Sequence, residues 1–89
     1  MADALTVDVV APDRVLWSGT AKRVIAPSVE GEIGLLAGHE PVLSILGPGT
    51  VRVHGSSGEQ QSFVIDRGVV SFDHDVITIV VRPVDIAAE

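Results

Sequence analysis

The sequence contains no cysteine and no tyrosine among its 89 residues. Disulfide bonds, thiolate chemistry and a cysteine or tyrosine nucleophile are therefore excluded. Aromatic residues are few, since only Trp17, Phe63 and Phe72 are present, and an aromatic-lined ligand groove is not expected. Helical periodicity is also missing, because glycine or proline interrupts each stretch in which apolar residues recur at helical spacing. A helical fold is therefore not expected.

The chain also lacks long apolar runs and an excess of positive charge. No segment approaches the roughly 18 apolar residues of a membrane span, and residues 1–8 lack the basic start and apolar run of a secretory signal. Six basic and twelve acidic residues give a formal net charge of −6. Such a surface repels phosphate backbones and anionic lipid headgroups, so we expect no nucleic-acid binding and no direct lipid insertion. It suits a partner with exposed Lys or Arg side chains.

Short segments of alternating apolar and polar residues take the place of helices. Alternation is clear in residues 5–10 and 51–54, while residues 76–81 form a denser apolar run that predicts a strand covered on both faces. Residues 55–58 are typical of a hairpin loop, and Gly68 is expected to supply a positive-φ turn position before the next strand. The pattern predicts an all-β fold, a β-sandwich or flattened barrel of about ten strands in two packed antiparallel sheets.

Signals for chemistry are weak. The histidines, including His39, have no partner at the short spacing of a zinc site, and residues 73–75 lack the following glycine and distal glutamate of a calcium loop. There is no Gly-x-Ser-x-Gly elbow, and no glycine-rich segment is followed by Lys and Ser or Thr. We therefore expect no catalytic residue, no metal and no cofactor. A small hydrolase built around His39 is the weakest alternative.

One block of the sequence is far more specific than these signals. Residues 31–43 read Gly-Glu-Ile-Gly-Leu-Leu-Ala-Gly-His-Glu-Pro-Val-Leu. This block resembles the signature of the epsilon subunit of F-type ATP synthases, which usually reads G-E-[IL]-G-[IL]-x-P-G-H-x-P-L-L. Residues 5–19, 21–27, 63–72 and 76–81 resemble the strands of that family in the same order, so the resemblance spans essentially the whole chain.

The resemblance implies a β-sandwich and a function in a rotary machine. It implies a non-catalytic rotor subunit of the central stalk, which joins the gamma subunit to the membrane c-ring and couples ion translocation to ATP synthesis. It also implies a peripheral protein on the cytoplasmic side of a bacterial cell membrane. The alternative from another class is a free-standing β-sandwich that binds a ligand or mediates adhesion, and the scarcity of aromatic residues disfavours it.

By position, the resemblance assigns Glu32, Ile33 and Leu35 to the c-ring interface, and Ala11, His39 and Ser44 to the gamma-subunit interface. The expected partner of Glu32 is a basic or amide-bearing loop side chain, and such an exposed pair contributes only about 0–1 kcal/mol. Apolar neighbours such as Leu35 and Leu36 are expected to supply more of the affinity. Two structural alternatives stay open: Glu32 as a solvated strand acid, and His39 as a turn histidine hydrogen-bonded to backbone near Pro41.

The chain departs from the family pattern at three places. Ala37 stands where the family prefers proline, and residues 82–85 replace an acidic-Thr-Ala stretch after the last strand. Longer relatives also continue into a helical hairpin that can bind ATP, whereas this sequence ends at Glu89 and residues 87–89 cannot form two helices. We therefore expect a single domain over residues 1–89, with no C-terminal hairpin and no ATP binding.

Overall fold

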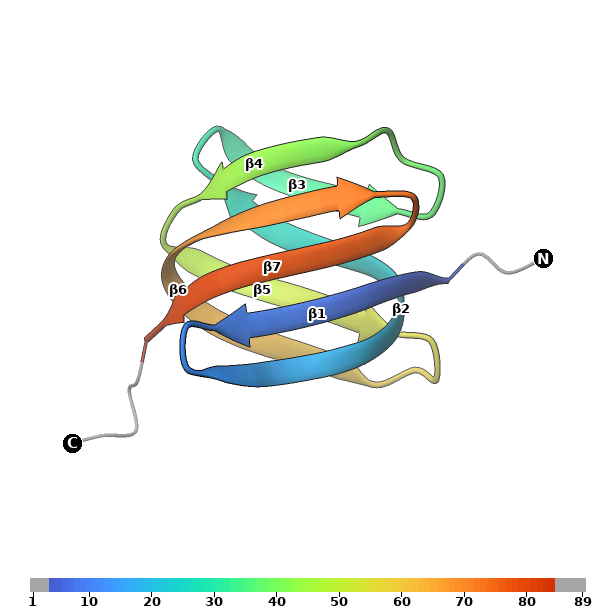
Figure 1. The fold of residues 1–89 in the computed structure, drawn as a ribbon, viewed down its shortest axis with the longest axis horizontal. Coiled ribbons are helices and arrows are strands. Elements are labelled where there is room, and N and C mark those ends of the chain that lie inside the picture. Colours follow the sequence, from blue (N-terminus) through green and yellow to red (C-terminus); the bar gives the residue numbers. More distant parts are fainter. Residues whose placement is uncertain (1–3, 85–89) are drawn as a thin grey trace.

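The computed structural model describes residues 4–84, and all of its regular structure is strand. The strands are β1 (Leu5–Ala11), β2 (Arg14–Ser28), β3 (Gly31–Leu36), β4 (Val42–Leu46), β5 (Gly49–Gly55), β6 (Gln60–Asp73) and β7 (Val76–Pro83), as shown in Figure 1. The prediction of an all-β fold is confirmed. Residues 87–89, for which no helix was expected, lie outside the described part of the chain. Within residues 4–84, no helix could cross a membrane.

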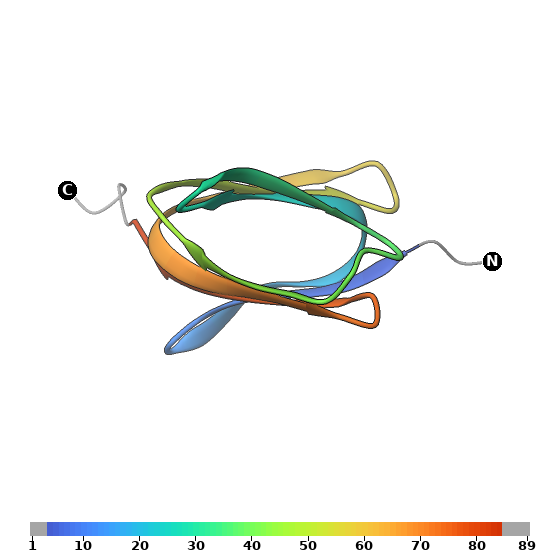
Figure 2. The ribbon, with the colours of Figure 1, turned by 90° about the horizontal axis from the view of Figure 1, so that it is seen from above.

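Two long strands bend so that each contributes to two packed layers. Figure 2 shows β2 and β6 curving around opposite edges of a flattened barrel. The upper layer contains β3, the second half of β2, β5 and the first half of β6. The lower layer contains β4, the second half of β6, β7, β1 and the first half of β2. The pairing register shifts at both bends, between Ala21 and Arg23 and between Ile65 and Arg67, and such irregularities bend a strand.

These bends explain a difference from the sequence-based prediction. The structure has seven strands, whereas about ten short ones were expected from the turn spacing, because β2 and β6 each pass through both layers without a break. A second difference concerns direction: β1 and β7 pair in parallel, with Val9 opposite Ile79, while the other pairings among the described strands are antiparallel. Strands β1, β2, β5, β6 and β7 pair in a closed ring. Closure makes the sandwich stiff and protects most of its edges.

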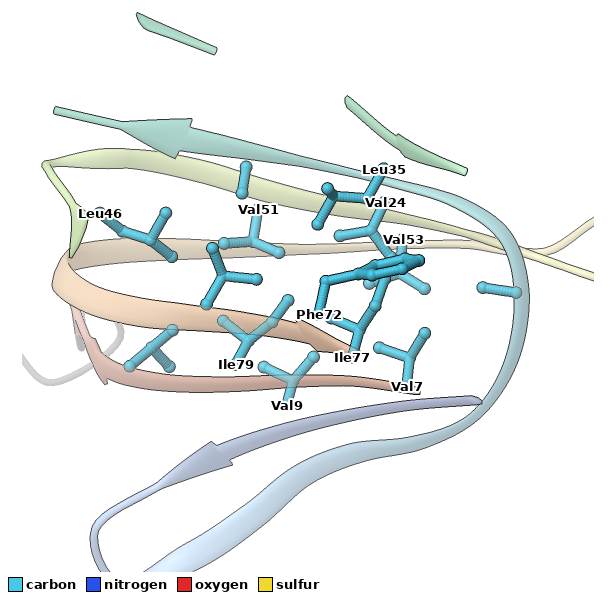
Figure 3. Close-up of a cluster of buried hydrophobic side chains, with 14 of the residues drawn as sticks. Val7, Val9, Val24, Leu35, Leu46, Val51, Val53, Phe72, Ile77 and Ile79 are labelled. Carbon is cyan, nitrogen blue, oxygen red and sulfur yellow. The ribbon is translucent and has the colours of Figure 1, made fainter. Parts of the chain in front are cut away.

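The core lies between the two layers and consists of aliphatic side chains around one phenylalanine. Leu5, Val7 and Val9 of β1 are fully buried, and the intervening residues face outward, as their alternation predicted. Phe72 of β6 is 1% exposed. Its ring lies in the interior and points from the lower layer toward Val53 of the upper layer (Figure 3). Burial of these side chains is the main favourable term in folding.

Strand β7 differs from its prediction in a way that matters for function. Residues 76–81 were expected to be covered on both faces. Ile77 and Ile79 are fully buried, but Val76 and Val80 are each 44% exposed. The prediction of two covered faces is wrong, because no further layer of the described chain packs on the outside of the lower layer. The apolar side chains on that outer face therefore contact solvent.

Gly68 also serves a purpose other than the one its sequence context suggested. It lies inside β6 and is not among the glycines with positive φ, so the predicted turn position is wrong. A Cβ atom at Gly68 would lie 2.5 Å from the carbonyl oxygen of Val80 and 3.2 Å from Cα of Val81. Glycine is required here because another backbone approaches too closely for a side chain.

Replacing Gly68 with alanine is expected to lower the free energy of unfolding by about 1–3 kcal/mol, because the β6–β7 pairing must widen to admit the methyl group. Gly34→Ala is the matched control, since nothing lies within 4 Å of the position that a Cβ atom would take there in β3. Urea denaturation measures both variants. Equal midpoints for the two would contradict the close approach at Gly68.

Candidate binding surfaces

The block at residues 31–43 lies on the surface, along β3 and the loop that follows it. Its side chains alternate across β3, so Glu32 and Leu36 face solvent while Leu35 points into the core. Leu35 is only 1% exposed, and Ile33 packs against the core with its side chain half-buried. Leu35, which the resemblance assigned to the c-ring interface, therefore offers almost no side-chain surface to a partner, because the two layers enclose it. Glu32 and Leu36 remain available to a neighbour.

Glu32 is held by an ion pair that the sequence did not predict. The Nη2 atom of Arg52 in β5 donates a hydrogen bond of 2.7 Å to Oε2 of Glu32. The two side chains are 36% and 58% exposed, so the pair is accessible from outside the upper layer. Partial burial of His54, together with the nearby Arg23 and Arg52 guanidiniums, lowers the pKa of its imidazole below the ordinary value. His54 thus stays neutral at neutral pH, and the positive charge here belongs to the arginines.

The turn before β3 is the most exposed apolar point near Glu32. Val29 is 63% exposed, and its amide donates a 3.0 Å hydrogen bond to the carbonyl of Ile45. Glu30 beside it is exposed, and its amide donates to the hydroxyl of Ser28 at 3.0 Å. The turn therefore forms an ordered tip that presents one apolar and two acidic side chains. The sequence analysis named Leu35 and Leu36 as the apolar neighbours of Glu32 and did not mark Val29; Leu36 is 56% exposed.

His39 lies in the exposed loop between β3 and β4, where its ring is oriented by two contacts. The Nδ1 atom lies 2.7 Å from the carbonyl oxygen of Glu40, which is the backbone contact near Pro41 that one alternative predicted. The ring also meets Phe72 edge to face, with centroids 5.6 Å apart. His39 is nevertheless exposed, so this geometry leaves it free to contact a partner as well.

Asp75 fixes the loop that carries His39. The Gly38 amide donates a 2.7 Å hydrogen bond to Oδ1 of Asp75, and the Thr6 amide donates to its carbonyl oxygen at 2.9 Å. Asp75 and His74 have φ values of 61° and 51°, in the left-handed region that costs energy for residues other than glycine. The turn between β6 and β7 thus ties together β1 and the loop before β4.

Asp75→Gly is expected to release the Gly38 amide and speed its hydrogen exchange by about tenfold, because the hydrogen bond is lost. Glycine accepts positive φ, so the turn itself stays formed. His74→Gly is the control, because it relieves the same backbone strain and keeps the carboxylate. Amide exchange measured by NMR separates the two, and equal protection of Gly38 in both variants would exclude a role for Asp75.

Ala11 and Ser44 lie on different strands of the lower layer, with β7 and β6 between them. Ala11 ends β1 and is 6% exposed, while Ser44 lies on the inward side of β4 and is half-buried. Neither residue presents much side chain to a partner. The residues on either side of Ser44 do: Ile45 is 63% exposed and Leu43 is 77% exposed.

An apolar row crosses the outer face of the lower layer and passes next to both positions. The pairing register places Ile45 beside Val69, Val69 beside Val80, Val80 beside Val10, and Val10 beside Val15. We call these five residues the valine row. Their exposed fractions include 63% for Ile45 and Val15, 44% for Val80 and 41% for Val69. The row joins segments of five strands, and contiguous exposed apolar patches on soluble proteins are often functional.

Two shallow hollows open beside the row. One has a volume of about 390 Å³ and is lined by Pro12, Ile45, Arg67, Gly68, Val69, Val80, Val81 and Arg82. The other has a volume of about 350 Å³ and is lined by Pro41, Val42, Leu43, Ser71, Phe72 and Asp73, next to the His39 ring. The lower layer therefore has two depressions into which a partner's side chains can fit. Among residues 4–84, no group of acidic or histidine side chains is arranged to hold a metal ion.

The sequence of the chain matches a known family over nearly its whole length. Residues 4–85 match the family model described as ATP synthase, Delta/Epsilon chain, beta-sandwich domain. The ATP synthase epsilon chain of Streptomyces avermitilis is 36% identical over 89 residues, covering all of this chain and 72% of that relative. The epsilon chain of Micrococcus luteus is 43% identical over 75 residues, covering 84% of this chain and 82% of that one.

Solved structures agree on the fold. A chain in a structure of the Euglena gracilis mitochondrial ATP synthase, containing OSCP, F1 and the c-ring, superimposes with a TM-score of 0.84 at 24% identity, over 91% of this chain and 52% of that one. A chain in the Tetrahymena thermophila central stalk and c-ring structure gives 0.73 at 16% identity, over 88% and 63% of the two chains. This chain thus spans about half to two-thirds of those structural relatives. The match over residues 4–85 shows that the chain belongs to the family of ATP synthase delta/epsilon chain β-sandwich domains.

Proposed function

We propose that this chain is a rotor subunit in the central stalk of an F-type ATP synthase, where it links the gamma subunit to the c-ring. It performs no bond-making itself and acts in coupling ion translocation to ATP synthesis. The family match and the epsilon-chain relatives support the assignment. The observation that carries it is the valine row, because a single-domain sandwich has no folding reason to leave such a row uncovered.

The valine row is the proposed contact with gamma. Two of its members are next to residues that the family resemblance assigned to that interface: Ala11 follows Val10, and Ser44 precedes Ile45. His39 borders the neighbouring hollow through its contact with Phe72. The three assigned residues thus lie beside the row or the neighbouring hollow, which supports one continuous gamma surface. The exposed aliphatic side chains supply the affinity there, since burial of apolar area dominates most protein interfaces.

The tip at Val29, Glu30 and Glu32 is the proposed contact with the c-ring. It belongs to the turn between β2 and β3 and to the outer face of the upper layer, whereas the valine row is on the outer face of the lower layer. The two surfaces adjoin at Ile45, whose carbonyl oxygen accepts the Val29 amide. Glu32 and the other members of the row lie on opposite outer faces, so one copy of the sandwich can contact both partners at the same time. Glu32 supplies steering and register more than affinity, and Val29 supplies the apolar contact.

The sandwich itself is the mechanical element. Its core is closely packed aliphatic side chain, and five of its strands pair in a closed ring. Packed interiors of this kind have low compressibility and transmit strain. Torque applied through gamma at one face therefore reaches the ring contact without bending the domain. In the cell, we place the chain on the cytoplasmic side of a bacterial membrane as a peripheral component of the complex, as its bacterial relatives suggest.

Binding to the recombinant gamma subunit of the same synthase tests the proposal directly. Titration calorimetry is expected to give a one-to-one complex with a negative heat-capacity change, because apolar surface is buried on association. A chain that stays monomeric in the presence of gamma would instead support a free-standing ligand-binding or adhesion module.

Glu32→Arg is expected to weaken association of the chain–gamma complex with c-ring reconstituted in detergent, because the acidic charge is replaced by a second positive charge beside Arg52. The loss is expected to be about tenfold, and the fold stays intact because Glu32 is exposed. Glu59→Arg, an equal charge reversal at another exposed position, is the control. Ring binding unchanged by Glu32→Arg would contradict the ring contact at this tip.

A further inference from the structure

The larger hollow beside the valine row combines an apolar lining with two positive charges that share one acidic neighbour among residues 4–84. Ile45, Val69 and Val80 from the row line it, and Arg67 and Arg82 stand at one end. At about 390 Å³, it is within the size range of sites that accept a ligand group or a large side chain. The hollow can therefore hold one large side chain of a partner. The arginines restrict which residues of the partner can flank that side chain.

The two arginines lie directly opposite each other in the β6–β7 pairing. Like charges at directly opposite positions on one sheet face repel. Their counterion within residues 4–84 is Asp66, whose Oδ2 atom lies 3.7 Å from Nε of Arg67 and 3.8 Å from Nε of Arg82. Both distances are too long for a hydrogen bond. One carboxylate at the edge of bonding range thus faces two guanidiniums, which are 69% and 65% exposed.

This local excess of positive charge stands out on a chain whose net charge is −6. A guanidinium has a planar set of donors that matches a carboxylate in a two-point hydrogen bond. A carboxylate brought in by a partner would satisfy donors that Asp66 leaves free and would relieve the repulsion across the pair. An aliphatic partner without such a group would bury the arginine stems and leave the charges unbalanced, which costs energy.

We infer that the segment of gamma that docks on the valine row carries a large apolar side chain that fills this hollow, flanked by an Asp or Glu that pairs with Arg67 and Arg82. The inference rests on the proposed gamma contact and adds the chemistry of the partner to it. The apolar side chain supplies most of the affinity, and the carboxylate fixes the register of gamma along the row. The charge pairing also makes association faster at low ionic strength.

The test compares two double variants that change the net charge equally. Arg67→Gln/Arg82→Gln removes the charges at the hollow, whereas Lys22→Gln/Arg23→Gln removes two exposed charges that do not line it. Binding to gamma is measured at low and high salt. The first variant is expected to bind about tenfold more weakly at low salt and to lose most of the salt dependence, and the second is expected to change affinity less than about twofold.

The outcomes distinguish failure of the carboxylate pairing from failure of the gamma contact. If wild type binds gamma and the two double variants behave alike, the carboxylate pairing is overturned while the gamma contact stands. If wild type fails to bind gamma, both proposals fall. When the expected loss appears, Asp and Glu residues of gamma are changed singly to the amide. One of these changes is expected to weaken binding to wild type and to have no further effect on Arg67→Gln/Arg82→Gln, and the absence of any such residue would contradict the inference.

Discussion

Phe72→Ala is expected to lower the free energy of unfolding by about 3–5 kcal/mol, a large part of the roughly 5–15 kcal/mol that stabilises an ordinary domain. Phe72 is the largest fully buried side chain among the described residues, at 1% exposure, and it lies between the two layers (Figure 3). Its removal leaves a cavity that the closed sandwich cannot collapse around. The variant also loses the edge-to-face contact with His39. Thermal and urea denaturation measure the change.

Phe63→Ala is the comparison for this prediction. Phe63 is the same residue type, but it is only partly buried against the core. Its truncation deletes less buried contact and opens the space to solvent, so the expected loss is clearly smaller. A loss at Phe63 equal to or greater than that at Phe72 would mean that the core is centred elsewhere than between these layers.

Val80→Asp is expected to weaken binding to gamma by about a hundredfold or more, equivalent to about 3 kcal/mol, while leaving the fold intact. Val80 is the middle member of the valine row, with Val69 on one side and Val10 on the other. In the free chain it is 44% exposed, so an aspartate there is solvated. In the complex the carboxylate would be buried against apolar groups without a partner. Titration calorimetry or surface plasmon resonance measures the loss.

Val64→Asp is a closely matched control for the binding experiment. Val64 has the same side chain and nearly the same exposure, at 45%, but it lies in the part of β6 that pairs with β5 in the upper layer. The variant carries the same added charge and tests the other face. Gamma affinity is expected to stay within about twofold of wild type, as is usual for a surface change away from an interface. A comparable loss in both variants would indicate a general effect of charge.

Much of the fold follows from local patterns in the sequence. The alternation of Leu5, Val7 and Val9 predicts the buried face of β1, and the structure confirms it. The segment between Gly55 and Gln60 is a hairpin loop, as its glycines and serines indicate. Within it, Gly58 adopts a φ of 97°, a conformation that favours glycine. These features depend only on residues within a few positions of one another, so a single sequence carries them.

The errors arise where distant segments meet. The dense run in β7 resembles a strand buried on both sides, but whether a third layer covers it depends on the rest of the chain, and none of the described strands does so. The need for glycine at Gly68 arises from the approach of Val80, a strand away. The bends in β2 and β6 lie within continuous strands, so turn signals overestimated the strand number. None of these is visible from local periodicity.

In the candidate surfaces too, features that depend on nearby residues could be predicted, and features that depend on distant segments could not. Residues 31–43 were sufficient to identify the family and to mark Glu32, and the structure places Glu32 on the surface. The pairing of Glu32 with Arg52 could not be predicted, because the residues are 20 positions apart in sequence. The valine row is likewise invisible in the sequence, since its five members come from separate segments and become neighbours only through the register. Alternation along β3 did, however, predict that Ile33 and Leu35 face away from Glu32.

Thiol labelling can map the gamma contact directly, because the chain has no cysteine of its own. Val80→Cys and Val64→Cys each introduce one reactive thiol of similar exposure, one on each outer face. The rate of maleimide labelling is measured with and without saturating gamma. We predict that gamma slows labelling at position 80 by at least about tenfold and leaves the rate at position 64 unchanged. Labelling at position 80 that continues at its free rate in the complex would contradict docking of gamma on the valine row.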